Sequence, residues 1–373
     1  MKVVLFSNTS WYLFNFRLPL IKVLMKHGYQ VVTIAPQDDY TSMITSEGII
    51  HYNASIDRRG LTIIPNLKTI ISVYRLYHSL NPDIVIHFTI KPVIFGTLIA
   101  RLCTRAKIIN NVTGLGYVFI GTTFLHTFLR PFVQWMYKCI LRLSSLLIFQ
   151  NKADRDFFIK SKIITQKIPS SVLISGSGVD LGKFHRNGDK EVDPEVHFIL
   201  IARMLYDKGI QEFIDAAEVV QKTYSNVVFH LVGDIDRGNP TAITMETISR
   251  WIERGIVNYH GRVDNIVPLL ANADVFVLPS YREGLSRSII EGMAMELPII
   301  TTNVPGCRET VIEYENGLLI RPYNVPDLIE AITFMIKNPE QRLKMGKKSR
   351  QIAESKFDVE IINKKYIYYL SKF

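Results

Sequence analysis

The chain has 373 residues, of which 47% are hydrophobic, and a formal net charge of +10. A typical domain has about 100–200 residues, so this length excludes a single core and predicts two domains. No run of about eighteen apolar residues is present, which excludes a spanning helix. The cysteines are too widely spaced for a disulfide framework or a structural zinc site; they are Cys103, Cys139 and Cys307.

Apolar runs alternate with segments at helical spacing along residues 1–149, which is typical of an α/β chain. The expected strands are 3–6, 30–34, 49–52, 83–87, 107–112 and 146–149. The expected helices are about 16–27, 39–47, 65–80, 93–103 and 128–144. This order predicts an open parallel sheet with helices on both faces.

The same alternation resumes at the strand 198–202 and continues to about residue 350. We therefore expect an α/β protein with two Rossmann-like parallel-sheet domains that face a cleft. The expected parts are a first domain at 1–165, a linker at 166–190, a second domain at 191–350 and a terminal segment at 351–373.

Polar residues follow three of the N-terminal strands, at the sheet edge where α/β proteins bind their ligands. The first loop, Ser7–Trp11, lacks the glycine triplet of a dinucleotide fingerprint. The loops His87–Pro92 and Thr113–Phe119 follow two further strands and belong to the same edge. We expect these loops to receive polar groups of a ligand.

Charge is unevenly distributed along the chain. Residues 1–187 contain 22 Lys+Arg and 8 Asp+Glu, whereas residues 188–373 contain 22 and 26. The basic half has no zinc-finger spacing, no RNA-binding motif and no dense Lys/Arg block, so we expect no nucleic acid partner.

An anionic membrane surface is the better partner for the basic half. Residues 119–149 are rich in large apolar side chains, as in a helix that lies in a membrane interface. The polar stripe of this segment, at helical spacing, consists of Gln134, Lys138, Arg142 and Ser145. The alternative is that the segment packs against its own sheet.

Two cations, Arg203 and Lys208, follow the strand Phe198–Ala202 and precede a helix that starts near Ile210. Cations at the end of one strand that face a helix N-terminus at the end of another concentrate positive potential at one point. An isolated Arg or Lys is more often a surface charge, so this interpretation depends on the neighbouring motif.

That motif is the segment 281–294, which places Glu283 and Glu291 on either side of a helix start near Ser286. The free N–H groups of the helix start and the charge of Arg287 suit a diphosphate. The Glu291 carboxylate suits a vicinal diol such as that of a ribose. Taken singly, each glutamate is more often a solvated surface carboxylate.

Asp234 and Asp236 follow another strand, and paired aspartates can hold a divalent cation on a nucleotide diphosphate. Here they precede Arg237–Pro240, which has the composition of a hydrated turn. Since Arg203 and Lys208 already supply positive charge, we expect neither a metal nor another cofactor.

The glutamate pair, Pro298 and the segment Thr302–Glu309 together resemble the donor-site region of retaining family-4 glycosyltransferases. The resemblance covers most of the chain and is strongest from 200 to 310. The chain is similar to bacterial enzymes that add a sugar to an undecaprenyl-diphosphate-linked saccharide, including N-acetylgalactosaminyltransferases. This implies the GT-B architecture, retention of anomeric configuration and a terminal helix that crosses back onto the first domain.

The resemblance also implies a UDP-sugar donor that carries a hexose or an N-acetylhexosamine. The expected donor-binding residues are Arg203, Lys208, Arg262, Val263, Glu283, Gly284, Leu285, Ser286, Arg287 and Glu291. The expected catalytic residues are Glu283, Arg203, Lys208 and His87. The expected acceptor-binding residues are Asn8, Thr9, Ser10, Arg17, Lys91, Thr113, Gly114 and Gly116.

The chain departs from the family at one histidine. Many relatives carry a histidine at the end of the strand that corresponds to 107–112, where it touches the transferred sugar, whereas this chain has Asn111 and Thr113. His87 is the only N-terminal histidine expected at the sheet edge, where it would bind acceptor phosphate together with Lys91 or assist the acceptor hydroxyl. The alternative is a structural histidine.

Met1 and Lys2 lead directly into the first strand, which leaves no room for a signal peptide. We therefore expect a cytoplasmic enzyme, peripheral on the inner face of the cell membrane, with a nucleotide sugar and a lipid-linked saccharide acceptor as its partners. Two alternatives remain: a nucleotide-sugar epimerase of GT-B-like shape, and a non-catalytic protein that binds anionic ligands.

Overall fold

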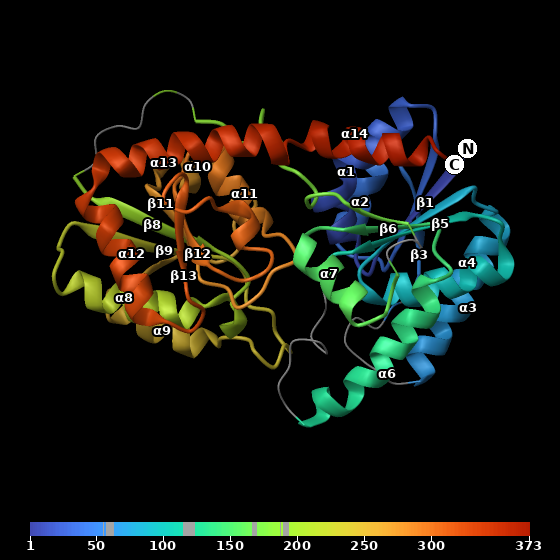
Figure 1. The fold of residues 1–373 in the computed structure, drawn as a ribbon, viewed down its shortest axis with the longest axis horizontal. Helices are drawn as coiled ribbons and strands as arrows, with labels where there is room; N and C mark the ends of the chain where they lie inside the picture. The colour runs from blue at the N-terminus through green and yellow to red at the C-terminus, as the bar shows by residue number, and fades with distance from the viewer. Residues whose placement is uncertain (55, 57–62, 115–123, 166–169, 187, 189–193) are drawn as a thin grey trace. The chain divides into compact units, whose positions relative to one another are not determined.

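The computed structural model describes the chain except residues 55, 57–62, 115–123, 166–169, 187 and 189–193. It divides into two compact units (Figure 1): unit 1 contains Met1–Ser177 and Ile362–Phe373, and unit 2 contains Gly178–Ile361. The boundary after Ser177 lies inside the predicted linker 166–190. Residues 351–361, expected in the terminal segment, belong to unit 2.

Unit 1 is built on a seven-stranded parallel sheet with the strand order β3-β2-β1-β4-β5-β6-β7. Its strands are β1 (Lys2–Phe6), β2 (Gln30–Ala35), β3 (Ile50–Asn53), β4 (Ile84–Phe88), β5 (Lys107–Val112), β6 (Leu146–Phe149) and β7 (Ser171–Leu173). Its helices are α1 (Ser10–Lys26), α2 (Tyr40–Ser46), α3 (Ile63–Leu80), a π-helix (Pro92–Gly96), α4 (Thr97–Cys103), α6 (Phe124–Leu141), α7 (Lys152–Lys160) and, from Ile362 onward, α14 (Val359–Leu370). All six strands predicted for this region are present.

Helices cover both faces of the unit 1 sheet, because successive side chains of a strand point to opposite sides. Leu24 of α1 and Ile362 of α14 pack on one face, in a core that includes Leu5 of β1. Val73 of α3 and Ile99 of α4 pack on the other face. The helix α6 covers this second face further along the sheet, over β5 and β6.

The helix α1 begins at Ser10, six residues before its predicted start. The Thr9 side chain explains this difference, since its hydroxyl oxygen accepts a hydrogen bond from the Tyr12 N–H at 3.0 Å and caps the helix. The loop after β1 is therefore limited to Ser7–Thr9, and the last two residues of the predicted loop, Ser10 and Trp11, belong to the helix.

Unit 2 contains a six-stranded parallel sheet with the order β10-β9-β8-β11-β12-β13. Its strands are β8 (Val196–Ile201), β9 (Val227–Val232), β10 (Asn258–Tyr259), β11 (Val275–Leu278), β12 (Ile299–Thr302) and β13 (Gly317–Ile320). Its helices are α8 (Ile210–Gln221), α9 (Met245–Glu253), α10 (Val267–Asn272), α11 (Arg287–Ala294), α12 (Val325–Lys337) and α13 (Pro339–Ile352). Short turns of helix lie at Tyr206–Lys208, Arg308–Thr310 and Ala353–Phe357.

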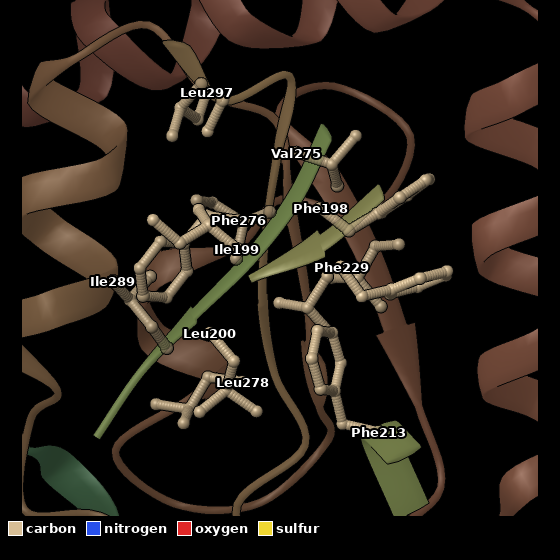
Figure 2. Close-up of a cluster of buried hydrophobic side chains, with 14 of the residues drawn as sticks. Phe198, Ile199, Leu200, Phe213, Phe229, Val275, Phe276, Leu278, Ile289 and Leu297 are labelled. Atoms are coloured by element: carbon tan, nitrogen blue, oxygen red, sulfur yellow. The ribbon is translucent and has the colours of Figure 1, made fainter. Parts of the chain in front are cut away.

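The core of unit 2 lies on both faces of its central strands (Figure 2). Phe198 and Phe229 stack on one face with their ring centroids 5.2 Å apart, and Phe213 of α8 meets Phe229 edge-on. On the other face, Ile289 of α11 lies by Phe276 of β11. Burial of such side chains stabilises the fold by about 1.5–3 kcal/mol each, so the strand ends that carry polar loops are held on a rigid support.

Candidate active site

The central pair of the site joins two loops from neighbouring strands. The strands β8 and β11 are adjacent and parallel, so the loops that follow them meet at the same edge of the sheet. There the Lys208 ammonium nitrogen lies 2.6 Å from Glu283 Oε1, with only 13% and 15% of the two side chains exposed. The structure thus brings together two residues that the sequence predicted for one site.

Close contacts between the two loops fix this pair. Gly209 follows Lys208 with a φ of +71°, and a Cβ atom built at Gly209 would lie 2.1 Å from the Pro279 carbonyl oxygen. The Tyr281 N–H also donates to the Asp207 carbonyl oxygen at 3.0 Å. Only glycine allows this approach of the two backbones, and the approach positions Lys208 beside Glu283.

Ser280 is a site residue that the sequence did not reveal. Its hydroxyl lies 2.9 Å from Glu283 Oε1 and 3.1 Å from the Asp207 carbonyl oxygen. Ser280 is fully buried in the loop that follows β11. A serine three residues before the motif glutamate was the available signal, but a Ser in a turn has many other uses.

The helix α11 supplies the second carboxylate. Ser286 caps the helix, and its side chain accepts from the Ile289 N–H. Arg287 follows Ser286 directly, and its Nε donates at 2.8 Å to Oε1 of Glu291, which lies one turn further along the helix. Burial raises the pKa of Glu291, and the Arg287 charge opposes that rise. The predicted diphosphate cation and the predicted ribose carboxylate are therefore paired with each other.

Arg203 is not part of the Lys208–Glu283 pair. Its guanidinium lies 2.7 Å from the Asp236 carboxylate and is 59% exposed. Arg262 pairs similarly with Asp264, at 3.4 Å. The turn considered for a metal thus provides an anionic partner for Arg203. Val263, Gly284 and Leu285 are half-buried.

Metal-ligating side chains are not gathered in the part of the chain that the structure describes. Among those residues, no three or more His, Cys, Asp or Glu side chains are arranged to hold a metal ion. Cys307 is buried near the site, and burial raises the pKa of its thiol to about 12, with the nearby Glu283 charge adding to the effect. A thiol of this kind is inert.

The prediction for His87 is wrong, because the side chain lies in the core on the face of α3 and α4. Its Nδ1 donates to Asn110 Oδ1 at 2.8 Å, and its Nε2 accepts from the Tyr77 hydroxyl at 2.8 Å. Burial lowers the pKa of His87 to about 4. With both ring nitrogens used and no exposed surface, the imidazole is a structural residue.

Three predicted acceptor residues are also engaged within unit 1. Thr9 caps α1, and the Ser10 hydroxyl donates to the Pro36 carbonyl oxygen at 2.8 Å. Arg17 is 1% exposed, and its guanidinium carbon lies 4.4 Å from the centre of the Phe88 ring. The prediction that these three side chains contact an acceptor directly is wrong, because other groups of the protein already hold them.

The remaining predicted acceptor residues are accessible where they are described. Asn8, Lys91, Thr113 and Gly114 are half-buried, at or after the ends of β1, β4 and β5. Gly116 lies outside the described residues.

The helix α6 packs against the sheet of unit 1, as the alternative interpretation of residues 119–149 predicted. Tyr137, Ile140 and Leu141 are buried in the core, whereas Trp135 is exposed. Of the predicted polar stripe, only Arg142 is exposed. Among the described residues, no helix has the length and apolar character needed to cross a bilayer.

Two family models match this chain. The model for glycosyl transferases group 1 matches residues 183–352, and the model described as glycosyl transferase 4-like matches residues 2–151. Together they cover most of both units. The chain belongs to these glycosyltransferases.

Curated relatives of this glycosyltransferase match over most of its length. One is the N,N'-diacetylbacillosaminyl-diphospho-undecaprenol alpha-1,3-N-acetylgalactosaminyltransferase of Campylobacter jejuni, 29% identical over 98% of this chain and 97% of the relative. Another is the UDP-Gal:alpha-D-GlcNAc-diphosphoundecaprenol alpha-1,3-galactosyltransferase of Escherichia coli, 27% identical over 74% of this chain and 71% of the relative.

Solved structures match the fold of this glycosyltransferase. Anabaena HepE in complex with UDP has a TM-score of 0.80 at 19% identity, with 100% of both chains covered. The sucrose-phosphate synthase of Thermosynechococcus elongatus has a TM-score of 0.83 at 17% identity, with 100% of this chain and 99% of that chain covered. The predicted GT-B fold of two parallel-sheet α/β domains is confirmed.

Proposed function

We propose that this glycosyltransferase moves a hexose or N-acetylhexosamine from a UDP-sugar onto a polyprenyl-diphosphate-linked saccharide in surface polysaccharide assembly. The transfer retains the anomeric configuration. The observation that carries the proposal is the Lys208–Glu283 pair in the loops after β8 and β11. The acceptor class is supported by two relatives whose names state a diphospho-undecaprenol saccharide.

The donor diphosphate is bound by Lys208, Arg203 and the N-terminus of α11. A cation–phosphate contact at ~4 Å with an effective dielectric of ~20 has a Coulomb energy of roughly 4 kcal/mol before desolvation. The Lys208 ammonium group has three N–H donors, and one of them donates to Glu283. The others are available to a phosphate oxygen, so the pair and the phosphate form one hydrogen-bonded group.

The two glutamates hold the hydroxyls of the donor. Glu283 Oε1 accepts from both Lys208 and Ser280, so Oε2 is the oxygen assigned to a hydroxyl of the sugar. Glu291 accepts from the ribose diol. Each charge-assisted bond of this kind contributes about 1.5–3 kcal/mol. The Arg287 charge opposes the rise that burial causes in the pKa of Glu291, and its contact at 2.8 Å orients the carboxylate.

The chemical step breaks the bond between the anomeric carbon and the leaving phosphate oxygen, and the acceptor hydroxyl oxygen bonds to that carbon from the same face. The departing diphosphate takes the hydroxyl proton, so no protein nucleophile is needed. Lys208 and Arg203 stabilise the charge that grows on the leaving group, which is often the largest contribution to catalysis. His87 has no part in this step, because its ring is buried and hydrogen-bonded.

The acceptor binds to unit 1, where Asn8, Lys91, Thr113 and Gly114 are half-buried. Because the proposed acceptor is lipid-linked, the enzyme works in the cytoplasm on the inner face of the membrane, with an anionic membrane surface as a partner. Neither nucleic acid nor a metal cofactor is required in this proposal.

The test is an assay of UDP release by the full chain with a panel of UDP-sugars, with and without a polyprenyl-diphosphate saccharide. We expect release that depends on the acceptor, persists in EDTA, and yields a product with the donor's anomeric configuration by NMR. Lys208→Ala should lose this activity, whereas Lys222→Ala, at a 71% exposed position of unit 2, should keep it. Isomerised donor formed without acceptor would instead identify an epimerase, and an inverted product would refute retention.

A further inference from the structure

We propose that the outer surface of α3 and α4 in unit 1 is the face that docks on an anionic lipid bilayer. The inference rests on the proposed function, which places the enzyme at a membrane, and adds the surface that makes contact. This surface, called the α3–α4 face, is defined by the outward apolar side chains of Leu67, Ile71, Tyr74, Leu98 and Leu102.

Large apolar side chains form a regular row on each of the two helices. On α3, Leu67, Ile71 and Tyr74 recur at the spacing of one helix face, and Leu98 and Leu102 do the same on α4. Their exposed fractions range from 37% to 73%. Both helices also bury an opposite row in the core, so these exposed residues are a second apolar face.

The two rows lie on one side of unit 1. The helices α3 and α4 pack against each other over the same face of the sheet (Figure 1). Tyr74 of α3 and Leu102 of α4 line a single hollow of about 850 Å³, together with Arg105 and Lys107. Apolar and cationic side chains therefore share one stretch of surface.

The charge around this face is mostly positive. One carboxylate, that of Asp83, also lines the hollow, and it accepts a hydrogen bond from the Lys2 N–H at 2.6 Å. Residues 84–153 contain no Asp or Glu and eight Lys or Arg. Lys68, Arg75, Arg101 and Arg105 are exposed on or beside α3 and α4, and none of them forms an ion pair within the described part of the chain.

The two units differ strongly in net charge. Unit 1 as a whole carries 23 Lys+Arg against 7 Asp+Glu, while unit 2 carries 21 against 27. The positive charge is thus concentrated in the unit that bears the exposed apolar rows.

The combination of exposed apolar rows with unpaired cations favours a lipid surface over a second copy of the chain as the partner of this face. Two α3–α4 faces would bring their unpaired cations together, which like-charge repulsion opposes. An anionic bilayer attracts the same cations and accepts the apolar side chains among its acyl chains, as interfacial helices do. The face is distinct from the segment 119–149, whose described core-facing residues Tyr137, Ile140 and Leu141 are buried in unit 1.

The experiment is flotation of the full chain with vesicles of phosphatidylcholine alone or with 30% phosphatidylglycerol (about one lipid in three, enough to set a negative surface potential). We expect binding to the anionic vesicles only, and weakening of at least tenfold when salt shortens the Debye length from about 10 Å to about 3 Å. Leu102→Glu should weaken binding at least tenfold. Leu343→Glu is the matched control, because Leu343 is a 62% exposed leucine on α13 of unit 2.

Charge is tested separately with Arg101→Glu/Arg105→Glu against Lys222→Glu, and only the first variant should lose binding. Equal loss in Leu102→Glu and Leu343→Glu, or equal flotation with neutral vesicles, would overturn the proposal. So would a dimer that Leu102→Glu dissociates while vesicle binding stays intact. UDP binding, measured on the same samples by calorimetry, should not change in Leu102→Glu. If the unaltered chain binds UDP but not the anionic vesicles, this proposal fails and the proposed function stands. If it binds the vesicles but not UDP, the proposed function fails instead.

Discussion

Gly306 lies directly against the main chain of Glu283. A Cβ atom at Gly306 would be 2.2 Å from the Glu283 carbonyl oxygen, and Gly306 has a φ of +84°. The Glu283 N–H also donates to the Pro305 carbonyl oxygen at 3.1 Å. The loop after β12 therefore fixes the backbone of Glu283, while hydrogen bonds from Lys208 and Ser280 fix its side chain.

Replacing Gly306 with alanine should displace Glu283. We expect Gly306→Ala to lower the free energy of unfolding by about 2 kcal/mol or more, since it adds left-handed strain to a backbone clash. Turnover should fall further than stability explains, because the glutamate moves. Gly255→Ala is the control: Gly255 has a φ of +68° with nothing within 4 Å of its Cβ position. Equal effects of both substitutions in urea unfolding and activity assays would contradict this account.

The Lys208–Glu283 pair should show strong coupling. Lys208→Ala leaves a mostly buried carboxylate without its cation, so we expect a loss of about 2–3 kcal/mol in unfolding free energy. The double variant Lys208→Ala/Glu283→Ala should lose less unfolding free energy than the two single variants lose when their losses are added. A double-mutant cycle by urea denaturation measures this. The exposed Lys222–Glu218 pair, at 3.7 Å, serves as the reference and should give a coupling near zero.

Donor affinity should fall in acid because of Glu291. The ribose diol donates to an ionised carboxylate, and burial raises the pKa of Glu291 in the free protein. Affinity for UDP should therefore begin to drop at a pH above the usual range of a glutamate and continue to fall as the pH decreases. Glu291→Ala should raise the dissociation constant about tenfold, which corresponds to ~1.4 kcal/mol.

The control for this effect is Glu291→Gln, which cannot ionise and should show a flatter pH profile of UDP binding in calorimetry. An unchanged profile in this variant would remove the assignment of Glu291 to the ribose.

His87 should make the stability of unit 1 depend on pH. The imidazole is neutral in the folded protein because burial lowers its pKa to about 4, whereas its unfolded value is about 6.5. Below pH 6.5 the unfolded chain takes up the proton first, so stability should decrease as the pH falls toward 4, by up to about 1.4 kcal/mol per pH unit. His87→Gln should remove that slope in urea unfolding at a series of pH values. His185→Gln, at an exposed position, should leave the slope unchanged. The same slope in the unaltered chain and in both variants would show that His87 is not its source.

The sequence predicted the elements whose signals are local. The strands β1 to β6 are apolar runs, and the meeting of Lys208 with Glu283 follows from loops after parallel strands. The position of His87 was not predictable in this way, because it depends on which face of β4 the side chain occupies. A strand that is buried on both faces is apolar at nearly every position, so its sequence pattern does not reveal which face a given side chain occupies. Its partner Tyr77 comes from α3, through packing that only the fold defines.

Arg17 shows the same limit at longer range. A basic residue near a sheet edge predicts a ligand contact, yet the guanidinium donates to two tyrosine hydroxyls. One is that of Tyr12 at 2.8 Å, and the other is that of Tyr366 on α14, at 3.3 Å and 349 residues away. The Tyr366 hydroxyl in turn donates to Asn111 Oδ1 at 2.5 Å. Contacts between the two ends of the chain leave no periodic signal in the sequence.

These contacts predict that Tyr366 anchors the C-terminal helix to unit 1. Tyr366→Phe keeps the ring in the core but removes the hydroxyl from both Asn111 and Arg17, so buried polar groups lose a partner. We expect the free energy of unfolding to fall by about 1–3 kcal/mol. Hydrogen exchange of α14 should also become faster, because its Tyr366 anchor is weakened. Tyr368→Phe, two residues on and 57% exposed, should leave both measurements unchanged.

The contact between Arg17 and Tyr366 makes a second test possible. Because Arg17 has no carboxylate partner among its described contacts, the double variant Arg17→Met/Tyr366→Phe should be more stable than Tyr366→Phe alone. A double variant less stable than Tyr366→Phe would show that the buried cation stabilises the fold in its own right.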